Sequence, residues 1–431
     1  MVEGSLRPGP AGPARHKGHV RRPFDSEATQ ASQPSSPTAY LLLYGTMYAA
    51  FGVASPFWPR LFESKGLTPQ QIGLILSAAL LVRLAAGPLI GRVADILAAL
   101  RLVLATCMVM AAVAAASLAS ANSFRVVLAV AMVQAAALAP VTSLADALAV
   151  NAARPVIAGK PFEYGWIRGA ASAAFLSGTL FAGQLVNPTD LIPIIWMNVA
   201  LLAVAAASTA LLFRANPRSA HDRTPVMANM RALLRMPSFR SVIVVSALIY
   251  GSHALYDAFA VIRWSHAGLE MSTISVLWAE AVAAEVVVFF VLGPWILDRL
   301  GAHAAALLAA TAGVVRWSVM GFTDSLLLLS FLQPLHGFTF ALLHLACMRI
   351  MAVAVPPGVA ATAQAIYALT AGLMTAALTS VSGALYARYG GMTFLAMGAL
   401  CLIALPFAWY GFADRPDRAA ETAPRRSAVD G

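Results

Sequence analysis

Long apolar runs, separated by short polar interruptions, fill most of the 431 residues. A hydrocarbon core about 30 Å thick needs roughly 20 apolar residues for one helical crossing. Such runs predict helices near 39–62, 70–90, 97–120, 124–149, 164–186 and 190–213 in the first part of the chain. They resume near 239–263, 272–296, 302–322, 325–352, 359–386 and 390–412. The pattern therefore predicts an all-α integral membrane protein with twelve transmembrane helices in two six-helix halves.

The polar stretches set the expected domain boundaries. Residues 1–37 are rich in Pro, Ser, Gly and Arg, and have too few large apolar side chains to fold, so they are expected to form a disordered tail. The first apolar run is too long for a signal peptide and is expected to remain as a helix. A polar segment from Arg214 to Arg240 divides the runs six and six. The expected parts are a bundle at 38–213, a basic linker at 214–238, a second bundle at 239–413 and a tail at 414–431.

Composition and charge exclude several classes of partner. Hydrophobic residues make up 60% of the chain and charged residues 11%, whereas an ordinary soluble domain carries about 25% charged residues. Lipid is therefore the expected solvent. The net charge of +10 comes from basic residues between the apolar runs and not from one basic stripe, which excludes a nucleic-acid partner. Cys107, Cys347 and Cys401 lie within apolar runs without metal-ligand spacing, so no metal site is expected.

The distribution of Lys and Arg predicts the orientation. If the N-terminus lies inside, most basic residues fall in tails and loops on that same side. The basic residues expected on the other side are Arg60, Lys65, Arg125, Arg263 and Arg388. Because basic residues accumulate in cytoplasmic loops, both termini are expected in the cytoplasm and the chain in the inner membrane.

The loop after the second helix of each half carries a similar motif. The first copy is Gly91-Arg-Val-Ala-Asp95, and the second is Asp298-Arg299-Leu-Gly301. Each resembles part of the G-x-x-x-D-R-x-G-R loop of the major facilitator superfamily. The first copy lacks the basic run, and the second lacks the upstream Gly at its usual spacing. The resemblance implies the fold in which two six-helix halves rock around a central site.

Several further segments resemble one family within this superfamily. They are Glu163-Tyr-Gly-Trp-Ile-Arg168, Arg316-Trp, His336-Gly-Phe-Thr-Phe-Ala-Leu-Leu-His344-Leu-Ala-Cys-Met-Arg349, Pro56-Phe-Trp58, Gly66-Leu-Thr, Asp146-Ala-Leu-Ala and His253-Ala-Leu-Tyr256. Together they are similar to the 3-phenylpropionate permease family, a relative of the lactose permease. This resemblance covers residues 38 to 412. It implies proton symport of an organic solute such as an aromatic acid, and related permeases carry sugars or nucleosides.

Charged residues within the apolar runs are the candidates for the substrate site. A charge at mid-bilayer costs from about 2.5 kcal/mol upward, so it normally faces a cavity or a partner. Arg168 has a planar fork that binds a carboxylate through two hydrogen bonds, and it matches the substrate-binding Arg of the lactose permease. The alternative for Arg168 is an ion pair with Asp146, which stands a helical turn further away than in the sugar permease. Phe175 is placed to stack on an aromatic solute or to pack in the core.

Two glutamates on the 272–296 helix are candidates for the proton carrier. Glu280 and Glu285 differ by about 140° around the helix, so both cannot face one cavity squarely. The resemblance favours Glu285, with an ion pair to Arg316 as the structural alternative. An ion pair that breaks when Glu285 is protonated would itself couple proton binding to a conformational change.

Histidines and one further acid complete the candidates for proton coupling. Histidine titrates nearest neutral pH, so His336 or His344 is a candidate relay, and the alternative is a neutral His bonded to a carbonyl. Where the lactose permease has an acid three residues after its His, this chain has Thr339. Glu285 or Asp257 is the expected substitute.

Two smaller groups of residues remain open. His253, Tyr256 and Asp257 share one helix face, where they either line the substrate entry or form a hydrogen-bonded cluster. Arg83 and Arg349 are ambiguous, and Arg349 is a candidate for snorkelling to the membrane surface.

The motifs of ATP-driven pumps and metalloproteases are missing from the sequence, which leaves transport as the expected function. The Gly159-Lys160 dipeptide is followed by Pro161, so there is no nucleotide-binding loop, and no His is followed by Glu as in a metalloprotease. No cofactor is expected beyond the proton gradient, and the chain is expected to work as a monomer in the bilayer on a small-molecule substrate. Besides aromatic-acid symport, nucleoside or sugar symport and drug/proton antiport remain as alternatives.

Overall fold

The computed structural model describes residues 37–152, 156–157, 160–161, 164–212 and 226–412. The predicted tail up to residue 36, residues 213–225 of the linker region and the predicted C-terminal tail lie outside the described residues. Glu163 of the family motif also lies outside them.

The first half of the chain is helical, as the apolar runs predict. Its elements are α1 (Pro37–Ala54), α2 (Trp58–Ser64), α3 (Pro69–Ile96), α4 (Leu100–Ser117), α5 (Phe124–Leu138), α6 (Val141–Ala152), α7 (Tyr164–Leu185), α8 (Ile192–Ser208) and the 3-10 turn η1 (Thr209–Leu211). Between α6 and α7 lies a short antiparallel pair, β1 (Val156–Ile157) and β2 (Lys160–Pro161), in which Val156 pairs with Pro161. Short breaks divide the first crossing into α1 and α2 and the fourth into α5 and α6.

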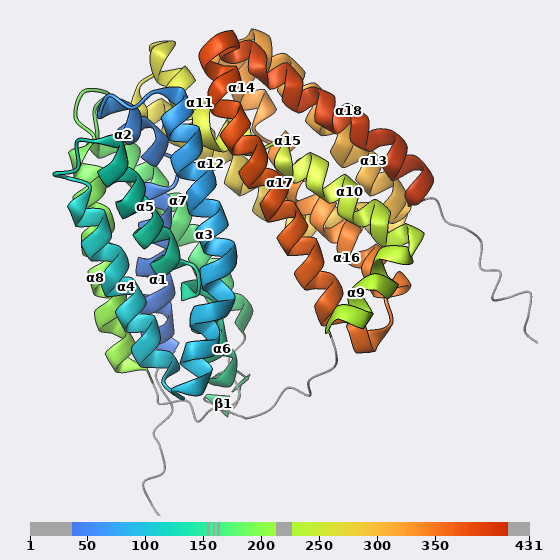
Figure 1. The fold of residues 1–431 in the computed structure, drawn as a ribbon, viewed down its shortest axis with the longest axis horizontal. Coiled ribbons are helices and arrows are strands. Elements are labelled where there is room, and N and C mark those ends of the chain that lie inside the picture. Colours follow the sequence, from blue (N-terminus) through green and yellow to red (C-terminus); the bar gives the residue numbers. More distant parts are fainter. Residues whose placement is uncertain (1–36, 153–155, 158–159, 162–163, 213–225, 413–431) are drawn as a thin grey trace, which may run out of the picture. The chain divides into compact units, whose positions relative to one another are not determined.

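The second half is also helical, with more interruptions. Its elements are α9 (Val226–Arg235), α10 (Pro237–Gly251), α11 (Ala254–His266), α12 (Met271–Val287), η2 (Val288–Leu292), α13 (Gly293–Phe322), α14 (Leu326–Leu332), α15 (Leu335–Gly337), η3 (Phe338–Leu342), α16 (Leu343–Ala354), η4 (Pro357–Val359), α17 (Ala360–Tyr389), η5 (Gly390–Thr393) and α18 (Phe394–Gly411). In Figure 1 the colours follow the chain, from blue for α1 to red for α18. The helix α9 lies within the segment 214–238 that was predicted as a basic linker.

The described residues hold twelve crossings in two groups of six. Two apolar stretches, Met271–Phe322 and Pro357–Gly411, contain 52 and 55 residues, which is enough for two crossings each at about 20 residues per crossing. Gly301 marks the turn inside the first of these stretches, because its φ of 77° and ψ of 170° are not helical. The predicted fold class is confirmed, and the predicted helix ranges agree with the observed ones to within several residues.

Close backbone approach between small residues packs the N-terminal half. A Cβ added at Gly52 would lie 2.1 Å from the carbonyl oxygen of Phe175, and one at Gly178 would lie 2.5 Å from that of Ala49. Helices in lipid have no hydrophobic drive to associate, so small residues that permit close packing stabilise the contact. These glycines therefore fix α7, which carries Arg168 and Phe175, against α1.

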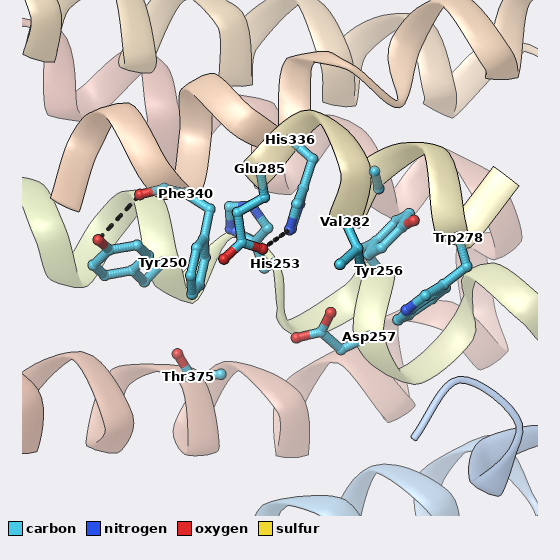
Figure 2. A pocket seen from close by; sticks show the side chains of 11 residues that line it. Tyr250, His253, Tyr256, Asp257, Trp278, Val282, Glu285, His336, Phe340 and Thr375 are labelled. Carbon is cyan, nitrogen blue, oxygen red and sulfur yellow. Dashed lines mark hydrogen bonds and ion pairs between the residues drawn. The ribbon is translucent and has the colours of Figure 1, made fainter. Parts of the chain in front are cut away.

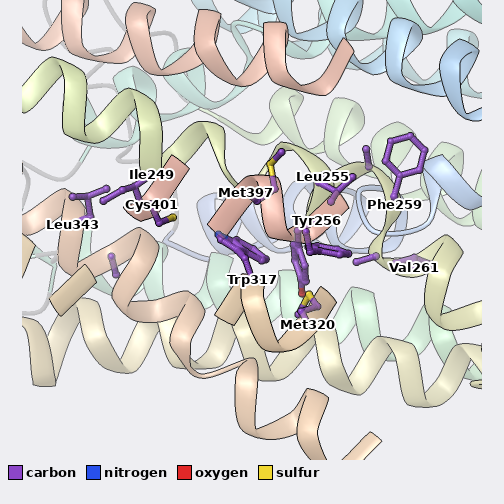
Figure 3. Packing of buried hydrophobic residues seen from close by; sticks show 14 of the residues in the cluster. Ile249, Leu255, Tyr256, Phe259, Val261, Trp317, Met320, Leu343, Met397 and Cys401 are labelled. Carbon is purple, nitrogen blue, oxygen red and sulfur yellow. The ribbon is translucent and has the colours of Figure 1, made fainter. Parts of the chain in front are cut away.

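Large buried aromatic residues fill the core of the C-terminal half (Figure 3). Trp317 and Tyr256 are 0% and 1% exposed, and their ring centroids lie 5.8 Å apart. The indole N–H of Trp317 donates to the hydroxyl of Ser252, so this buried donor has a hydrogen-bond partner within the core. This packing holds α10, α11 and α13 together around the residues of the candidate site.

The two halves contact each other at the end where α2 leads into α3 and α11 into α12. We call this the closed end. A Cβ at Gly73 of α3 would lie 2.8 Å from the Thr379 carbonyl of α17, and one at Gly183 of α7 would lie 2.2 Å from Ser275 Oγ of α12. A polar side-chain contact adds to the packing, because His266 Nε2 of α11 lies 3.1 Å from Glu63 Oε1 of α2. Figure 1 shows α3 and α17 side by side.

Candidate transport site

Arg168 belongs to a polar cluster between α1, α6 and α7. Its Nη1 donates to the hydroxyl of Tyr48 at 2.6 Å and lies 3.8 Å from Asp146 Oδ1. The hydroxyl of Tyr44 donates to the same oxygen at 2.6 Å. The structure thus shows the ion pair that was the alternative to substrate anchoring. The anchoring role of Arg168 stays a prediction.

A cavity of about 400 Å³ lies between the two halves. Aromatic rings from two crossings, the first (α1 and α2) and the fifth (α7), form much of its wall: Tyr48, Phe51, Trp58, Phe62 and Phe175. Its polar lining includes Gln134 and Asn198 from the N-terminal half and Thr375 and Thr379 from α17. Two charged residues also line it, Arg83 of α3 and Asp257 of α11. We call this space the aromatic cavity.

A second cavity of about 280 Å³ lies within the C-terminal half. Figure 2 shows its lining, with Glu285 and His336 pointing toward one another and Asp257 nearby. We call it the coupling cavity. Asp257 and Thr375 line both cavities. Asp257 is also the one exposed residue in the stretch 254–262 of α11, where every other residue is buried. Its side chain therefore opens to the space that both cavities share.

A chain of polar contacts leads from Glu285 to Arg316. His336 Nε2 lies 3.5 Å from Glu285 Oε2, and Arg316 donates from Nη1 to His336 Nδ1 at 3.0 Å. A guanidinium can only donate, so Nδ1 of His336 is the acceptor and the ring proton sits on Nε2. In this tautomer the imidazole is neutral and presents its N–H to the carboxylate of Glu285.

Arg316 is fully buried and held by several partners. Its guanidinium carbon lies 4.5 Å from the ring centroid of Tyr256 and 4.4 Å from that of Trp317, an arrangement that stabilises the cation through both ring faces. It also donates to Gln333 Oε1 at 3.4 Å. The direct ion pair between Glu285 and Arg316 that the sequence suggested is replaced by a path through His336, because the imidazole lies between the two groups.

His253 and Tyr256 line the coupling cavity instead of the Arg168 cluster. His253 donates from Nδ1 to the Ile249 carbonyl at 3.0 Å, and its Nε2 lies 3.0 Å from the hydroxyl of Thr339. Tyr256 donates to Gln333 Oε1 at 3.0 Å. This is the hydrogen-bonded cluster that was the alternative to an entry site. Asp257, expected on the same helix face, is the member that faces the aromatic cavity.

His344 lies apart from His336 in a different contact network. Its Nδ1 is 3.3 Å from the hydroxyl of Tyr367, which in turn lies 3.0 Å from the hydroxyl of Tyr250. Tyr250 lines the coupling cavity. The two histidines of the predicted motif therefore connect to the cavity by separate routes.

Local helix geometry positions Glu285 and His336. The π-helical segment η2 begins three residues after Glu285, and η3 begins two residues after His336. Such segments widen a helix and are frequent at functional sites. Gly337 directly follows His336, and Ala284 directly precedes Glu285. A Cβ added at Gly337 would lie 2.7 Å from the Ala284 carbonyl oxygen. The glycine thus permits the close approach that brings the imidazole to the carboxylate.

The two loop motifs lie away from both cavities. Asp298 pairs with Arg349 at 3.1 Å, so Arg349 has an ionic partner at the helix ends. The guanidinium of Arg299 lies 5.7 Å from the Trp295 ring centroid. Gly91 and Asp95 stand at the end of α3, where a Cβ at Gly91 would meet nothing within 4 Å. Among the described residues, there is no group of three His, Cys, Asp or Glu side chains that could hold a metal ion.

Some residues of the site were not found from the sequence. Tyr44, Tyr48 and Phe51 form a stripe at i, i+4 and i+7 on α1, with Tyr44 and Tyr48 stacked at 6.0 Å. That spacing is a detectable signal for one helix face. Gln333 carried no such signal, because its role depends on the helices that pack around it. Arg83 was noted as ambiguous and proves to line the aromatic cavity.

The fold and the site define a membrane transporter of the major facilitator superfamily. The family model described as "MFS_1 like family" matches residues 38–401, and the chain belongs to this family. The chain is 35% identical over 381 residues to a protein of Escherichia coli (strain K12) described as a "probable 3-phenylpropionic acid transporter". That match covers 86% of this chain and 96% of the relative. The predicted family resemblance is confirmed.

Other known proteins are more distant. The chain is 26% identical to the maltose permease of Geobacillus stearothermophilus, with 82% of this chain and 88% of the relative covered. A crystal structure of a mutant of the nucleoside transporter NupG superposes with a TM-score of 0.77 at 16% identity, and covers 86% of this chain and 98% of that one. The structural likeness shows the major facilitator fold. These proteins are transporters, so the protein is a multi-pass membrane transporter and not an enzyme.

Proposed function

We propose that this protein is a proton-coupled permease that takes up a small aromatic acid. The observation that carries the proposal is the pairing of Glu285 with a neutral His336 in a cavity that shares Asp257 and Thr375 with the aromatic cavity. An ionisable carboxylate inside the membrane span is a candidate proton carrier, since it is costly there unless it is paired or protonated. Glu285 lines the coupling cavity, which shares two lining residues with the aromatic cavity. This proximity supports coupling between proton movement and solute movement.

Alternating access between the two halves is the proposed mechanism. The close contacts at Gly73, Gly183 and Gly383 seal one end of the interface. The basic residues predict that both termini lie on the cytoplasmic side of the inner membrane. In that orientation the closed end lies on the outer side of this membrane. The structure then corresponds to the inward-facing state, in which solute leaves the aromatic cavity for the cytoplasm. Only the proton gradient supplies energy in this proposal, and one chain is sufficient.

The substrate class rests on the cavity wall and on the relative. Five aromatic side chains with two amide groups suit a planar ring that carries a polar tail. The relative from Escherichia coli is described as a probable transporter of 3-phenylpropionic acid, which has this composition. Aromatic walls also stack on sugars and nucleobases, so these solutes belong in the test.

Uptake into proteoliposomes tests the proposal. Purified protein is reconstituted, a proton gradient is imposed, and accumulation of labelled 3-phenylpropionate, maltose and uridine is compared with and without an uncoupler. We expect accumulation of the aromatic acid alone, and its loss with the uncoupler. Preferential uptake of maltose or uridine would contradict the substrate class. Accumulation that persists without a proton gradient, or export driven by it, would contradict symport.

A further inference from the structure

Arg83 occupies the middle of a membrane-spanning helix. It is near the centre of the 28 residues of α3, so about 20 Å of helix separates it from either end at 1.5 Å per residue. Snorkelling cannot carry the guanidinium that far to the membrane surface. A charge at this depth must instead find a partner or a polar cavity.

The orientation of α3 directs Arg83 into the aromatic cavity. Ile75, Ala79 and Arg83 are spaced at i, i+4 and i+8, and all three line the cavity together with Leu76 and Leu80. They form one stripe of the helix surface. Arg83 is exposed on this stripe, whereas the apolar residues around it form the wall.

The other arginines of the membrane spans already have protein partners. Arg168 is bonded to Tyr48 and paired with Asp146. Arg316 is bonded to His336 and enclosed by two aromatic rings. Within residues 37–412, as far as they are described, Arg83 makes no hydrogen bond or ion pair with another side chain. Arg83 lines the cavity, and no described side chain accepts from its five N–H donors.

We infer that Arg83 binds the carboxylate of the transported acid. A guanidinium matches a carboxylate with two parallel hydrogen bonds, and the low-dielectric wall of the aromatic cavity strengthens the pair. The other ionisable side chain on the wall, Asp257, offers no positive charge to an anion. The acid therefore binds with its carboxylate at Arg83 and its ring against the aromatic side chains. This assignment rests on the proposed function and gives Arg168 the different role of holding Tyr48 at the cavity wall.

A pair of matched ligands isolates the interaction. The half-saturation concentration for 3-phenylpropionate uptake is measured together with inhibition by neutral 3-phenylpropionamide, in proteoliposomes with wild type, Arg83→Gln and Arg83→Lys. Loss of one charge-assisted contact weakens acid binding by about 10- to 100-fold. We expect a shift of that size for the acid in Arg83→Gln, a smaller shift in Arg83→Lys, and unchanged inhibition by the amide. Arg92→Gln on the same helix is the control, and Arg168→Gln tests the competing candidate for the carboxylate site.

The outcomes separate this inference from the proposed function. Wild-type protein that transports no aromatic acid defeats the proposed function and this inference with it. Wild-type uptake with an unchanged half-saturation in Arg83→Gln, or a selective loss in Arg168→Gln instead, overturns the Arg83 assignment alone.

A second measurement does not depend on the folding of a variant. Phenylglyoxal modifies accessible arginines, and mass spectrometry reports the rate at Arg83 in the wild-type protein. We expect 3-phenylpropionate to slow this modification and the amide to leave it unchanged. Equal rates with and without the acid overturn the assignment.

Discussion

Ala98 has a backbone conformation that usually favours glycine. It stands three residues after Asp95 with a φ of 50°, and Gly301 stands three residues after Asp298 with a φ of 77°. The two loops therefore share a positive φ at the position where the superfamily motif has glycine. At positive φ an L-residue with a side chain destabilises the fold by about 1–2 kcal/mol, because its Cβ approaches the following carbonyl oxygen. The repeat is visible in the backbone although the first copy has Ala98 where the second has Gly301.

Substitutions at these two positions should change stability in opposite directions. We expect Ala98→Gly to stabilise the protein by about 1 kcal/mol. Gly301→Ala should destabilise it by about 1–3 kcal/mol, because a φ of 77° with a ψ of 170° is a conformation that almost only glycine adopts. Thermal unfolding of the purified protein in detergent measures both effects. Ala267→Gly is the control, because the exposed Ala267 at the end of α11 has a φ of −75°, which alanine adopts without strain. An Ala98→Gly variant no more stable than this control would contradict the strain.

The residue scale also shows where sequence reasoning reaches its limit. The sequence predicted Glu285, Arg316 and His336 as candidates for proton coupling, together with His344 and Asp257, because charges and histidines in apolar runs are rare. It could not order them, since the position of an imidazole between two charged groups depends on the rotation of three helices. Arg83 was undervalued for the same reason. A charge in an apolar run signals a partner, but only the packed structure shows which arginines already have one.

Replacing the proposed carrier tests the coupling role of Glu285. In Glu285→Gln the amide resembles the protonated acid, so solute can bind and exchange across the membrane. Net accumulation needs the empty carrier to return with a carboxylate facing the N–H of His336, and the amide carries no such charge. We therefore expect normal counterflow and loss of proton-driven accumulation in proteoliposomes.

Glu280→Gln is the matched control for that experiment. Glu280 accepts from Ser330 at 3.2 Å and does not line the coupling cavity. This variant should accumulate solute normally. If instead Glu285→Gln accumulates solute and Glu280→Gln does not, the carrier is Glu280.

At the scale of elements, the sequence predicts the length of each membrane-spanning segment but not the breaks within it. The apolar run near 325–352 predicts one continuous helix, whereas the structure divides it into α14, α15, η3 and α16. Hydrophobicity reports how much chain is buried in lipid and is insensitive to the hydrogen-bond pattern within it. The π-helical segments next to Glu285 and His336 arise from contacts between neighbouring helices, so no local pattern announces them.

The close approach at Gly337 offers a test of how elements set the site. In Gly337→Ala the new methyl group would meet the Ala284 carbonyl at 2.7 Å, so α15 must move away from α12. Overpacking of this kind costs about 1–3 kcal/mol. We expect a lower melting temperature and reduced proton-driven accumulation with counterflow retained, since His336 moves away from Glu285. Gly358→Ala, where an added Cβ meets nothing within 4 Å, is the control.

At the scale of the whole molecule, small residues control how the halves meet. The apolar pattern and the basic segment predicted two halves, and the comparisons confirm the major facilitator fold. The sequence does not show which end of the interface between the halves is closed, because both conformations of an alternating-access transporter bury the same helices. The glycines at the closed end supply that information. Gly73, Gly183 and Gly383 each sit against a helix of the other half.

A larger side chain at Gly183 should therefore favour the alternative conformation. A Cβ there would lie 2.2 Å from Ser275 Oγ and 2.8 Å from the Met271 carbonyl, so leucine cannot fit while the halves are closed. Overpacking by about 1–3 kcal/mol shifts a two-state equilibrium by roughly 5- to 150-fold. We expect Gly183→Leu to populate the state that opens at this end, and to slow transport because the carrier returns less readily to the closed form.

Accessibility of a cysteine in the aromatic cavity measures this shift. Ser55 lines the cavity near the closed end, and the three native cysteines are buried, so Ser55→Cys provides one accessible thiol. In right-side-out vesicles, a membrane-impermeant maleimide should label this cysteine slowly in the otherwise wild-type protein and faster when Gly183→Leu is added. Gly45→Leu is the control, because an added Cβ at Gly45 meets nothing within 4 Å. Equal labelling of the Gly183→Leu and Gly45→Leu variants would show that the contact does not hold the halves closed. Faster labelling from the opposite side of the membrane would reverse the proposed orientation.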